Sequence, residues 1–364
     1  MSEEREIVDA AARRGRGALT NRSGRFEAAQ AVAVDDGWGS LDAIAPVRTE
    51  IVTERPRRII TRNASPDLPF DRSINPYRGC EHGCVYCFAR PTHAFLGLSS
   101  GLDFETRLTV KPGAAQLLAR ELSKPGYKPE TIAIGTNTDP YQPIEKDQRI
   151  MREILETLRA FRHPVDIVTK GALIDRDLDI LGEMGREGLA EVGVSLTSLD
   201  PALSRKMEPR AAAPHRRLAI IERLVEAGCP VRAMVAPVIP GLNDQELDAL
   251  LAAARDAGAT TATYIALRLP LEVAGLFEEW LHEHFPDRAQ KVMKQVKSLH
   301  GGKVYDASWG RRMRGEGVLA DLIARRFEAA IKRLGLRRGS SPLRTDLFDP
   351  PNRQPLQLSL FGDA

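Results

Sequence analysis

The chain has 364 residues, of which 43% are apolar, and its formal net charge is only +3. This length allows one large domain with extensions or two ordinary domains. No apolar run is long enough to span a membrane, and residues 1–17 carry charges where a signal peptide has its apolar segment, so neither is expected. Four cysteines in so long a chain do not make a disulfide scaffold, which predicts a reducing, cytoplasmic location.

The N-terminal part of the chain, residues 1–62, is predicted to be a flexible arm. Residues 1 to about 45 show no periodicity and are rich in Gly, Arg, Asp and Ala. After a basic segment and several turn residues, the chain enters RGCEHGCVYCFARPTH (78–93), which contains three of the four cysteines.

Strand-like and helix-like segments alternate from residue 131 onward. The strand-like segments are 131–136, 165–170, 189–196, 231–239 and 261–269, and the helix-like ones are 149–161, 173–184, 215–228 and 243–258. This alternation is typical of βαβ units and a parallel sheet. With one more strand just before Cys80, about six units are expected in residues 63–285, fewer than the eight of a full TIM barrel. The pattern alone allows an open, partial barrel or a doubly wound sheet.

Polar residues stand where these strands end, and a parallel α/β fold places its functional site there. The strand ends are GTNTD (135–139), Thr169-Lys170, SLTS (195–198) and PVIPGLND (237–244). Ordinary turn and cap chemistry explains some of them. A lysine that closes an apolar strand is harder to explain in this way, because its ammonium then points into the mouth of the fold.

Positive charge is concentrated in residues 287–345, which contain fifteen Lys or Arg against five Asp or Glu. Residues 286–340 are therefore predicted to be a basic helical extension, with a helix over 318–335. The loop YDASWGRRMRG (305–315) mixes aromatic residues with arginines, a composition suited to unpaired nucleic acid. The candidate nucleic-acid contacts are Arg311, Arg312, Arg314, Arg325 and Arg326. A solvated helical face explains the same charge equally well.

The clustered cysteines, at positions 80, 84 and 87, form a C-x3-C-x2-C motif. A structural zinc needs four ligands, so His82 or His93 would have to join them in a spacing unusual for zinc. A [4Fe–4S] cluster fits better, because a tight loop can bind three irons and leave the fourth open for a substrate or cofactor. Cys229 is expected to be a small buried thiol and not a ligand.

With Tyr86 directly before the last cysteine, this motif resembles the signature of the radical S-adenosylmethionine (SAM) superfamily. RSINPYRGCEHGCVYCFAR followed by GTNTDPYQPIE is similar to the branch of the spore photoproduct lyases and the DNA repair photolyase-like proteins. The resemblance covers roughly residues 68–270 and implies a partial (β/α)6 TIM-type barrel. It also implies a [4Fe–4S] cluster that reductively cleaves SAM to a 5′-deoxyadenosyl radical, and an electron donor such as flavodoxin or ferredoxin.

The resemblance assigns roles to individual residues. The catalytic cluster ligands would be Cys80, Cys84 and Cys87, and the SAM contacts would be Tyr86, Gly135, Thr136, Lys170, Ser195, Val238 and Ile239. Among these, Gly135 and Thr136 would meet the SAM amino group, and Lys170 and Ser195 its carboxylate. Val238 and Ile239 would pack on the adenine. The chain departs from the lyases at Phe88, where they have a second tyrosine, so the scaffold and cofactors are expected but the thymine-dimer reaction is not.

The basic extension favours an enzyme that acts on DNA. The same scaffold serves many substrates, so an RNA- or protein-modifying radical enzyme is an alternative, and a non-catalytic iron–sulfur sensor is another. Lys170, Ser195 and Gly135 argue against the sensor, because a sensor needs no SAM pocket.

Residues 341–364 are predicted to form a detached, proline-rich tail. The tail contains Gln357, Leu358, Ser359, Leu360 and Phe361, a sequence that resembles the pentapeptide by which bacterial replication and repair proteins bind the DNA sliding clamp. A terminal strand that docks back on the barrel is the alternative. The resemblance predicts a weak, direct contact with the clamp.

Overall fold

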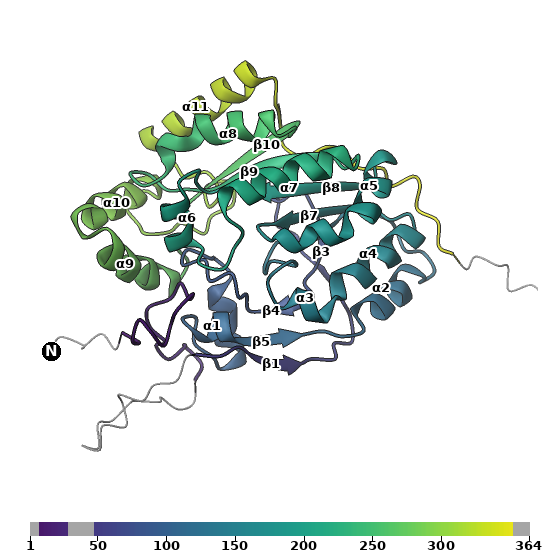
Figure 1. Cartoon of the computed structure of the whole chain (residues 1–364), viewed down its shortest axis with the longest axis horizontal. Helices are drawn as coiled ribbons and strands as arrows, with labels where there is room; N and C mark the ends of the chain where they lie inside the picture. Colours follow the sequence, from purple (N-terminus) through teal and green to yellow (C-terminus); the bar gives the residue numbers. More distant parts are fainter. Residues whose placement is uncertain (1–6, 28–46, 352–364) are drawn as a thin grey trace, which may run out of the picture.

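A curved sheet of eight strands forms the centre of the computed structural model, which describes residues 7–27 and 47–351 (Figure 1). The strand order is β11-β10-β9-β8-β7-β6-β3-β2. All neighbouring strands are parallel except β2 and β3, which are antiparallel. In chain order these strands are β2 (Ile60–Arg62), β3 (Arg72–Ile74), β6 (Ile132–Ile134), β7 (Val165–Thr169), β8 (Ala190–Ser195), β9 (Val231–Val238), β10 (Thr261–Ala266) and β11 (Arg337–Arg338).

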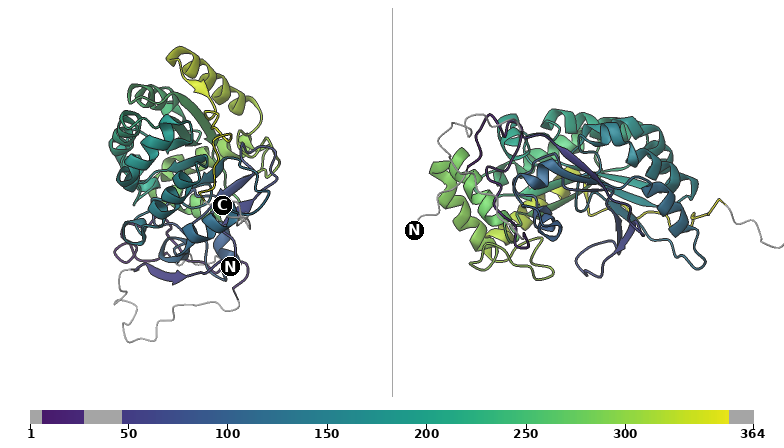
Figure 2. Two further views of the ribbon diagram at one scale, coloured as in Figure 1. Left: turned by 90° about the vertical axis from the view of Figure 1, so that its right-hand side faces the viewer. Right: turned by 90° about the horizontal axis from the view of Figure 1, so that it is seen from below.

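The six parallel strands from β3 to β10 follow one another in chain order across the sheet, and a helix lies in each connection. Because the strand order never reverses, the sheet is not doubly wound. Figure 2 shows the connecting helices on the outer side of the curved sheet. The prediction of a partial (β/α)6 barrel is therefore confirmed.

The helices agree with the apolar periodicity of the sequence. They are α1 (Asp103–Thr106), α2 (Ala114–Leu122), α3 (Glu145–Gln148), α4 (Ile150–Ala160), α5 (Leu178–Arg186), α6 (Pro201–Met207), α7 (Pro214–Glu226), α8 (Leu247–Asp256), α9 (Val273–His284), α10 (Pro286–Leu299) and α11 (Val318–Leu334), with 3₁₀ turns η2 (Arg90–Leu96), η3 (Ala172–Asp177) and η4 (Asp244–Glu246). In α4, Ile154, Leu155 and Leu158 are completely buried against the sheet. Each such side chain stabilises the fold by roughly 1.5–3 kcal/mol.

The described part of residues 1–62 is not a flexible arm, which corrects the prediction. The strand β1 (Glu50–Thr53) pairs with β5 (Arg107–Val110), and β5 pairs with β4 (Tyr77–Arg78) in a second, three-stranded sheet. The segment 7–27 packs beside α9, and Leu19 in it is only 2% exposed. The composition of this segment suggested a flexible arm, because its packing partners, β5 and α9, lie far away in the sequence and cannot be read from the segment itself.

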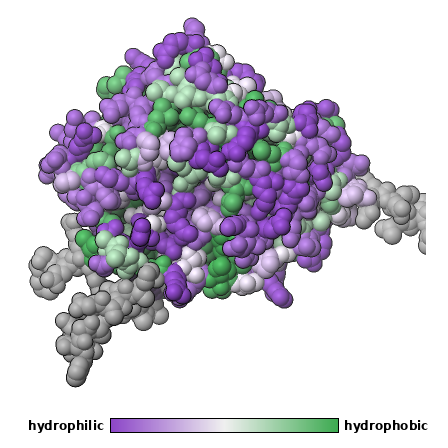
Figure 3. Space-filling view, in the orientation of Figure 1, coloured by the Kyte–Doolittle hydropathy of each residue, from purple (hydrophilic) through white to green (hydrophobic). Residues whose placement is uncertain are grey.

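The basic extension is helical, as predicted, and it covers the end of the barrel sheet. The apolar face of α11 buries Ile323, Phe327 and Ile331, and α11 contacts α8 and β10. No helix in the described part of the chain is long and apolar enough to cross a membrane. The face in Figure 3 is mostly hydrophilic, with apolar residues in small, separate patches.

The first part of the predicted tail is also docked and not detached. The N–H of Arg344 donates to the carbonyl of Gly188, and the N–H of Asp349 donates to that of Phe161. Phe348 lies against Tyr127, Phe161 and His163. Phe161 and Gly188 lie in the connections that lead into the starts of β7 and β8, so this segment crosses the amino ends of the strands.

His163 lies beneath this docked segment as a buried, neutral imidazole. Its Nδ1 donates to the Pro164 carbonyl at 3.0 Å, so its Nε2 accepts from the Tyr127 hydroxyl at 2.9 Å. Burial lowers the pKa of His163 to about 4, and the nearby positive charge of Arg72 acts in the same direction.

The protein is therefore expected to lose stability through His163 as the pH falls from 7 to 5. The unfolded imidazole binds a proton near pH 6.5 and the folded one only near pH 4, so the loss is about 2 kcal/mol. Urea unfolding of the wild type and of His163→Gln at pH 7 and pH 5 measures this loss in the free energy of unfolding. The wild type should lose about 2 kcal/mol more than the variant, and an equal loss in the two proteins would contradict the assignment.

Candidate active site

The cysteine motif forms a tight loop between β4 and η2. Gly83 has a φ of +68°, and a Cβ there would lie 2.8 Å from an oxygen of Glu105, so only glycine fits. The Cys80 N–H donates to the Phe104 carbonyl at 2.9 Å, and the Cys87 N–H donates to the Cys84 carbonyl at 3.2 Å. These bonds hold three cysteines on one short, closed turn.

The three thiols are close enough to influence one another. Burial raises the pKa of Cys80, and the charges of Asp139, Cys84 and Cys87 raise it further. All three thiols are free, and those of Cys84 and Cys87 are partly exposed. Three soft donors on one loop, with a cationic side chain beside them, fit a cluster that keeps one iron open. A zinc site would need side chains that converge on one ion, and among the described residues no group of three or more His, Cys, Asp or Glu is so arranged.

Cys229 lies away from this loop, as expected. It is only 1% exposed and lies two residues before Val231, where β9 begins. The cysteine loop belongs to the other end of the barrel, where Lys170 and Ser195 lie at the carboxyl ends of β7 and β8.

Lys170 and Ser195, predicted together for one carboxylate, do meet in the structure. The ammonium of Lys170 donates to the Ser195 hydroxyl at 2.7 Å and lies 6.0 Å from the centre of the Tyr86 ring. Its side chain is 17% exposed, so it is the part of this pair that solvent or a ligand can reach. An ammonium beside a hydroxyl is suited to an anionic oxygen. Their contact with the SAM carboxylate stays a prediction.

Behind Lys170 lies Glu208, a fully buried carboxylate. It accepts hydrogen bonds from the Tyr86 hydroxyl, from the Arg217 guanidinium and, at 2.6 Å, from the Thr197 hydroxyl, and it lies 3.9 Å from the Lys170 ammonium. Burial alone would raise its pKa, but the charges of Arg217 and Lys170 and these hydrogen bonds hold the pKa at about 2. Glu208 is therefore an anion that connects the cysteine loop to the ends of two barrel strands.

Gly135 directly follows β6 in a conformation that only glycine adopts easily. Its φ is +87°, and a Cβ would lie 2.0 Å from the Val168 carbonyl oxygen. The half-buried Thr136 follows it. The close approach of the β7 backbone therefore requires this glycine, and the predicted contact of Gly135 and Thr136 with the SAM amino group stays a prediction.

Asp139, at the end of the same turn, joins β6 to β7 and to the cysteine loop. It accepts from the Thr169 hydroxyl and the Lys170 N–H, each at 2.7 Å, and lies 3.3 Å from Nδ1 of His82. Burial alone would raise its pKa, but His82 and these hydrogen bonds hold the pKa at about 2. Asp139 thus sets the backbone position from which Lys170 extends.

Val238 and Ile239 do not line the mouth as side chains. They are 1% and 0% exposed and are packed in two hydrophobic clusters, so neither presents surface to an adenine ring. Asn243 holds this turn, because it accepts from the Ile239 N–H at 2.6 Å and donates to the carbonyls of Thr197 and Pro237. An adenine contact here would have to come from the backbone.

A second buried ion pair holds the cysteine loop from outside. Arg90, which is completely buried, donates to the Cys84 carbonyl at 3.0 Å and to Glu105 at 2.5 Å. Glu105 also accepts from the N–H groups of Gly17 and Ala18, each at 2.8 Å. The N-terminal segment is therefore part of the wall around the loop.

The structure divides the five candidate nucleic-acid arginines into two groups. Arg312 donates to Asp67 at 2.5 and 2.8 Å, Arg326 lies 3.1 Å from Asp248, and Arg311 lies 3.2 Å from Glu316. For the exposed Arg314 and Arg325, no side-chain partner is found in the part of the chain that the structure describes. Arg312 and Arg326 thus hold the extension in place, which sequence reasoning did not foresee. The clamp-like residues Gln357, Leu358, Leu360 and Phe361 lie outside the described residues.

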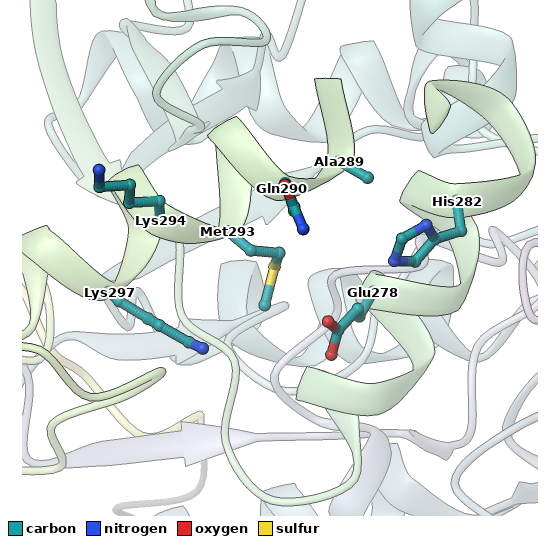
Figure 4. A pocket seen from close by; sticks show the side chains of 7 residues that line it. All are labelled: Glu278, His282, Ala289, Gln290, Met293, Lys294 and Lys297. Atoms are coloured by element: carbon teal, nitrogen blue, oxygen red, sulfur yellow. The ribbon is translucent and has the colours of Figure 1, made fainter. Parts of the chain in front are cut away.

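A groove of about 250 Å³ lies between α9 and α10 (Figure 4). Its walls are Glu278, His282, Ala289, Gln290, Met293, Lys294 and Lys297. None of the predicted site residues lines it.

Sequence reasoning missed Glu208, Arg217, Arg90 and Glu105. Glu208 lies in the connection between α6 and α7 and Arg217 in the first turn of α7, and a charged residue at such a position is usually solvated. Asp139 belongs to the strand-end segment GTNTD, and its position as a polar residue after a predicted strand could have identified it.

Comparisons with known proteins match the segment that contains the cysteine loop. Residues 74–254 match the model of the radical SAM superfamily. An uncharacterised protein of Mycobacterium tuberculosis is 43% identical over 260 residues, which are 71% of this chain and 75% of that protein. An uncharacterised protein of Methanocaldococcus jannaschii is 25% identical over 249 residues, which are 68% of this chain and 89% of that protein.

Among solved structures, a spore photoproduct lyase complexed with dinucleoside spore photoproduct is similar, with a TM-score of 0.58 and 16% identity. The similarity covers 79% of this chain and 81% of that one. It shows a shared fold.

Lys170→Ala is expected to weaken SAM binding while the cluster is kept. Loss of a charge-assisted contact to a carboxylate costs about 1.5–3 kcal/mol. Equilibrium dialysis with SAM after anaerobic reconstitution measures the affinity, and iron and sulfide assays check the cluster. Lys124→Ala, at an exposed lysine after α2, is the matched control. Equal SAM affinity in the two variants would remove Lys170 from the site.

Proposed function

The chain belongs to the radical SAM superfamily, and we propose that it acts on nucleic acid, with DNA as the favoured substrate and DNA repair as its role. As a radical SAM enzyme it uses a [4Fe–4S] cluster and SAM. This membership removes the iron–sulfur sensor as an alternative.

The position of the aromatic and basic loop 305–315 carries the proposal. The Met313 carbonyl accepts from the N–H of Ala266, the last residue of β10, at 2.9 Å. The loop therefore lies at the carboxyl ends of the strands, the same end as Lys170 and Ser195. Its Trp309 is 64% exposed, and Arg314 is exposed nearby in the chain. Exposed aromatic rings and arginines together suit unpaired bases and phosphates.

The fold also supports the proposal of a nucleic-acid substrate. It is shared with a spore photoproduct lyase whose structure contains a dinucleoside spore photoproduct. At 16% identity this likeness concerns the scaffold, and Phe88 departs from the lyase pattern. The proposal therefore covers nucleic acid as the substrate class and not a particular lesion.

The cofactors, when bound, supply reductive cleavage of SAM and hydrogen-atom abstraction from a substrate. In this chain Cys80, Cys84 and Cys87 would hold the cluster, and the turn after Gly135 would receive the SAM amino group. Lys170 would bind the SAM carboxylate through its ammonium, with Ser195 beside it.

The ion pairs behind the site keep these groups oriented. Glu208 and Ser195 hold the Lys170 ammonium at the mouth, so little side-chain freedom is lost when an anion binds. Val85 and Tyr86 pack with α9 and α10 in a hydrophobic cluster that excludes water behind the cysteine loop. An RNA-modifying enzyme would use the same site, so substrate choice has to be measured.

Replacing Arg314 and Arg325 by glutamine should weaken DNA binding and flatten its salt dependence. Each phosphate contact on a single strand contributes about 0.7 to the slope of log affinity against log salt, so the slope should fall by about 1.4. Fluorescence anisotropy with labelled single-stranded DNA measures it.

Arg120→Gln with Arg255→Gln is the matched control, because it removes two exposed charges from α2 and α8. The same slope in both double variants would leave the basic extension as a solvated surface. Stronger binding of an RNA of equal sequence would shift the proposal from DNA to RNA.

We further propose that the C-terminal pentapeptide 357–361 recruits the enzyme to the sliding clamp. The support is the sequence resemblance and the path of the described chain before it. Residues 344–349 cross the amino ends of the strands, away from the mouth. A partner held there leaves the active site open to DNA.

The full-length protein should bind purified bacterial clamp, and Leu360→Ala with Phe361→Ala should abolish this binding. The leucine and phenylalanine are expected to supply most of the buried apolar area, so their loss leaves too little binding energy. Surface plasmon resonance measures it, with Leu356→Ala as the control just outside the pentapeptide. Equal binding by the wild type and the double variant would exclude recruitment through this peptide.

A further inference from the structure

Arg268 lies at the mouth of the barrel, two residues after β10 ends. The central carbon of its guanidinium is 4.5 Å from the centre of the Phe88 ring and 6.0 Å from that of Tyr305. Phe88 directly follows the last cluster ligand, Cys87, and Tyr305 belongs to the C-terminal loop. Arg268 therefore joins the cysteine loop to the loop proposed to bind nucleic acid.

The positive charge of Arg268 has no counter-charge within the described residues. Among the residues that the structure describes, its terminal nitrogens contact only neutral groups: the Met313 sulfur at 3.4 Å, and the Tyr305 hydroxyl at 3.4 Å, which is long for a hydrogen bond to oxygen. Its Nε is buried without a hydrogen-bond partner in the described structure.

Other buried or half-buried arginines around the site are neutralised. Arg217 binds Glu208, Arg90 binds Glu105, and Arg312 binds Asp67. For Arg268, no carboxylate of the described residues lies within ion-pair distance. A half-buried cation between two aromatic rings and a thioether is costly unless an anion completes its surroundings. Stacking on the rings recovers only part of that cost.

The surface beside Arg268 indicates which kind of anion would complete the surroundings of its guanidinium. Phe88 is 41% exposed, although one side of its ring contacts the guanidinium. An exposed aromatic ring next to an unpaired arginine is the combination that binds an unstacked base with its phosphate. The guanidinium fork also matches the paired oxygens of a phosphodiester.

We propose that Arg268 binds a backbone phosphate of the nucleic-acid substrate and that Phe88 stacks on the adjoining base. This inference rests on the proposed function and adds a subsite to it. Because Phe88 is the neighbour of Cys87, the stacked nucleotide lies next to the cluster loop. The subsite thus places a base within reach of the chemistry.

Arg268→Gln tests the phosphate contact. With a short fluorescein-labelled single-stranded oligodeoxynucleotide, the affinity of the reconstituted full-length variant should fall about tenfold, the effect of losing one charge-assisted contact. The slope of log affinity against log salt should fall by about 0.7. Arg268→Lys should keep the slope, since it keeps the charge. Arg120→Gln should change neither quantity.

Phe88→Ala tests the stacking. It should weaken binding about tenfold with no change in slope, because a ring is lost but no charge. Phe88→Tyr should bind like the wild type. Replacing one base of the oligodeoxynucleotide by fluorescent 2-aminopurine gives a direct signal, since its emission changes when the base leaves its neighbours and stacks on Phe88, and Phe88→Ala should abolish this change.

Two further measurements separate this subsite from other roles of Arg268. SAM affinity and cluster content should be unchanged in Arg268→Gln, and a loss of SAM affinity with normal DNA binding would assign the residue to the SAM carboxylate instead and overturn the proposal. Equal DNA affinity and slope in Arg268→Gln and the wild type would overturn the subsite while the proposed function stands. No DNA binding by the wild type would overturn both.

Discussion

The buried carboxylate of Glu208 is the interaction on which the site depends. It accepts from Tyr86 of the cysteine loop, from Thr197 after β8 and from Arg217 of α7, and it attracts Lys170 after β7. A buried charge is stable only with such partners, so each partner is also held in one place. One anion therefore sets the position of the cysteine loop relative to the mouth of the barrel.

The shape of the cysteine loop depends on a second constraint, which is its close packing against Glu105 and the N-terminal segment. Gly83 faces Glu105, and a Cβ on Gly17 would lie 1.8 Å from the Gly83 carbonyl oxygen. Arg90 and Glu105 satisfy the polar backbone groups of both segments. A loop confined in this way needs little rearrangement to bind a rigid cluster, so most of the binding energy is kept.

The two ends of the barrel serve different purposes. The carboxyl ends of the strands carry Lys170, Ser195, Arg268 and the loop 305–315, and the amino ends are closed by the C-terminal segment around Phe348. Buried Arg232 also pairs with Asp166 and Glu191 near the starts of their strands. The groups for which binding is proposed are thus concentrated at one end, and the contacts at the other end contribute stability.

The sequence by itself determined the elements and the motif: the strand and helix periods and the C-x3-C-x2-C spacing. These are local patterns, because the period of a helix or strand and the geometry of a short loop depend on neighbouring residues. Only the tertiary structure decided that residues 7–27 wall in the cysteine loop, that Glu208 anchors it, and that Arg268 lacks a carboxylate where Arg312 has one. Charge pairing and burial join residues far apart in the chain, and a single sequence shows the charges without their partners.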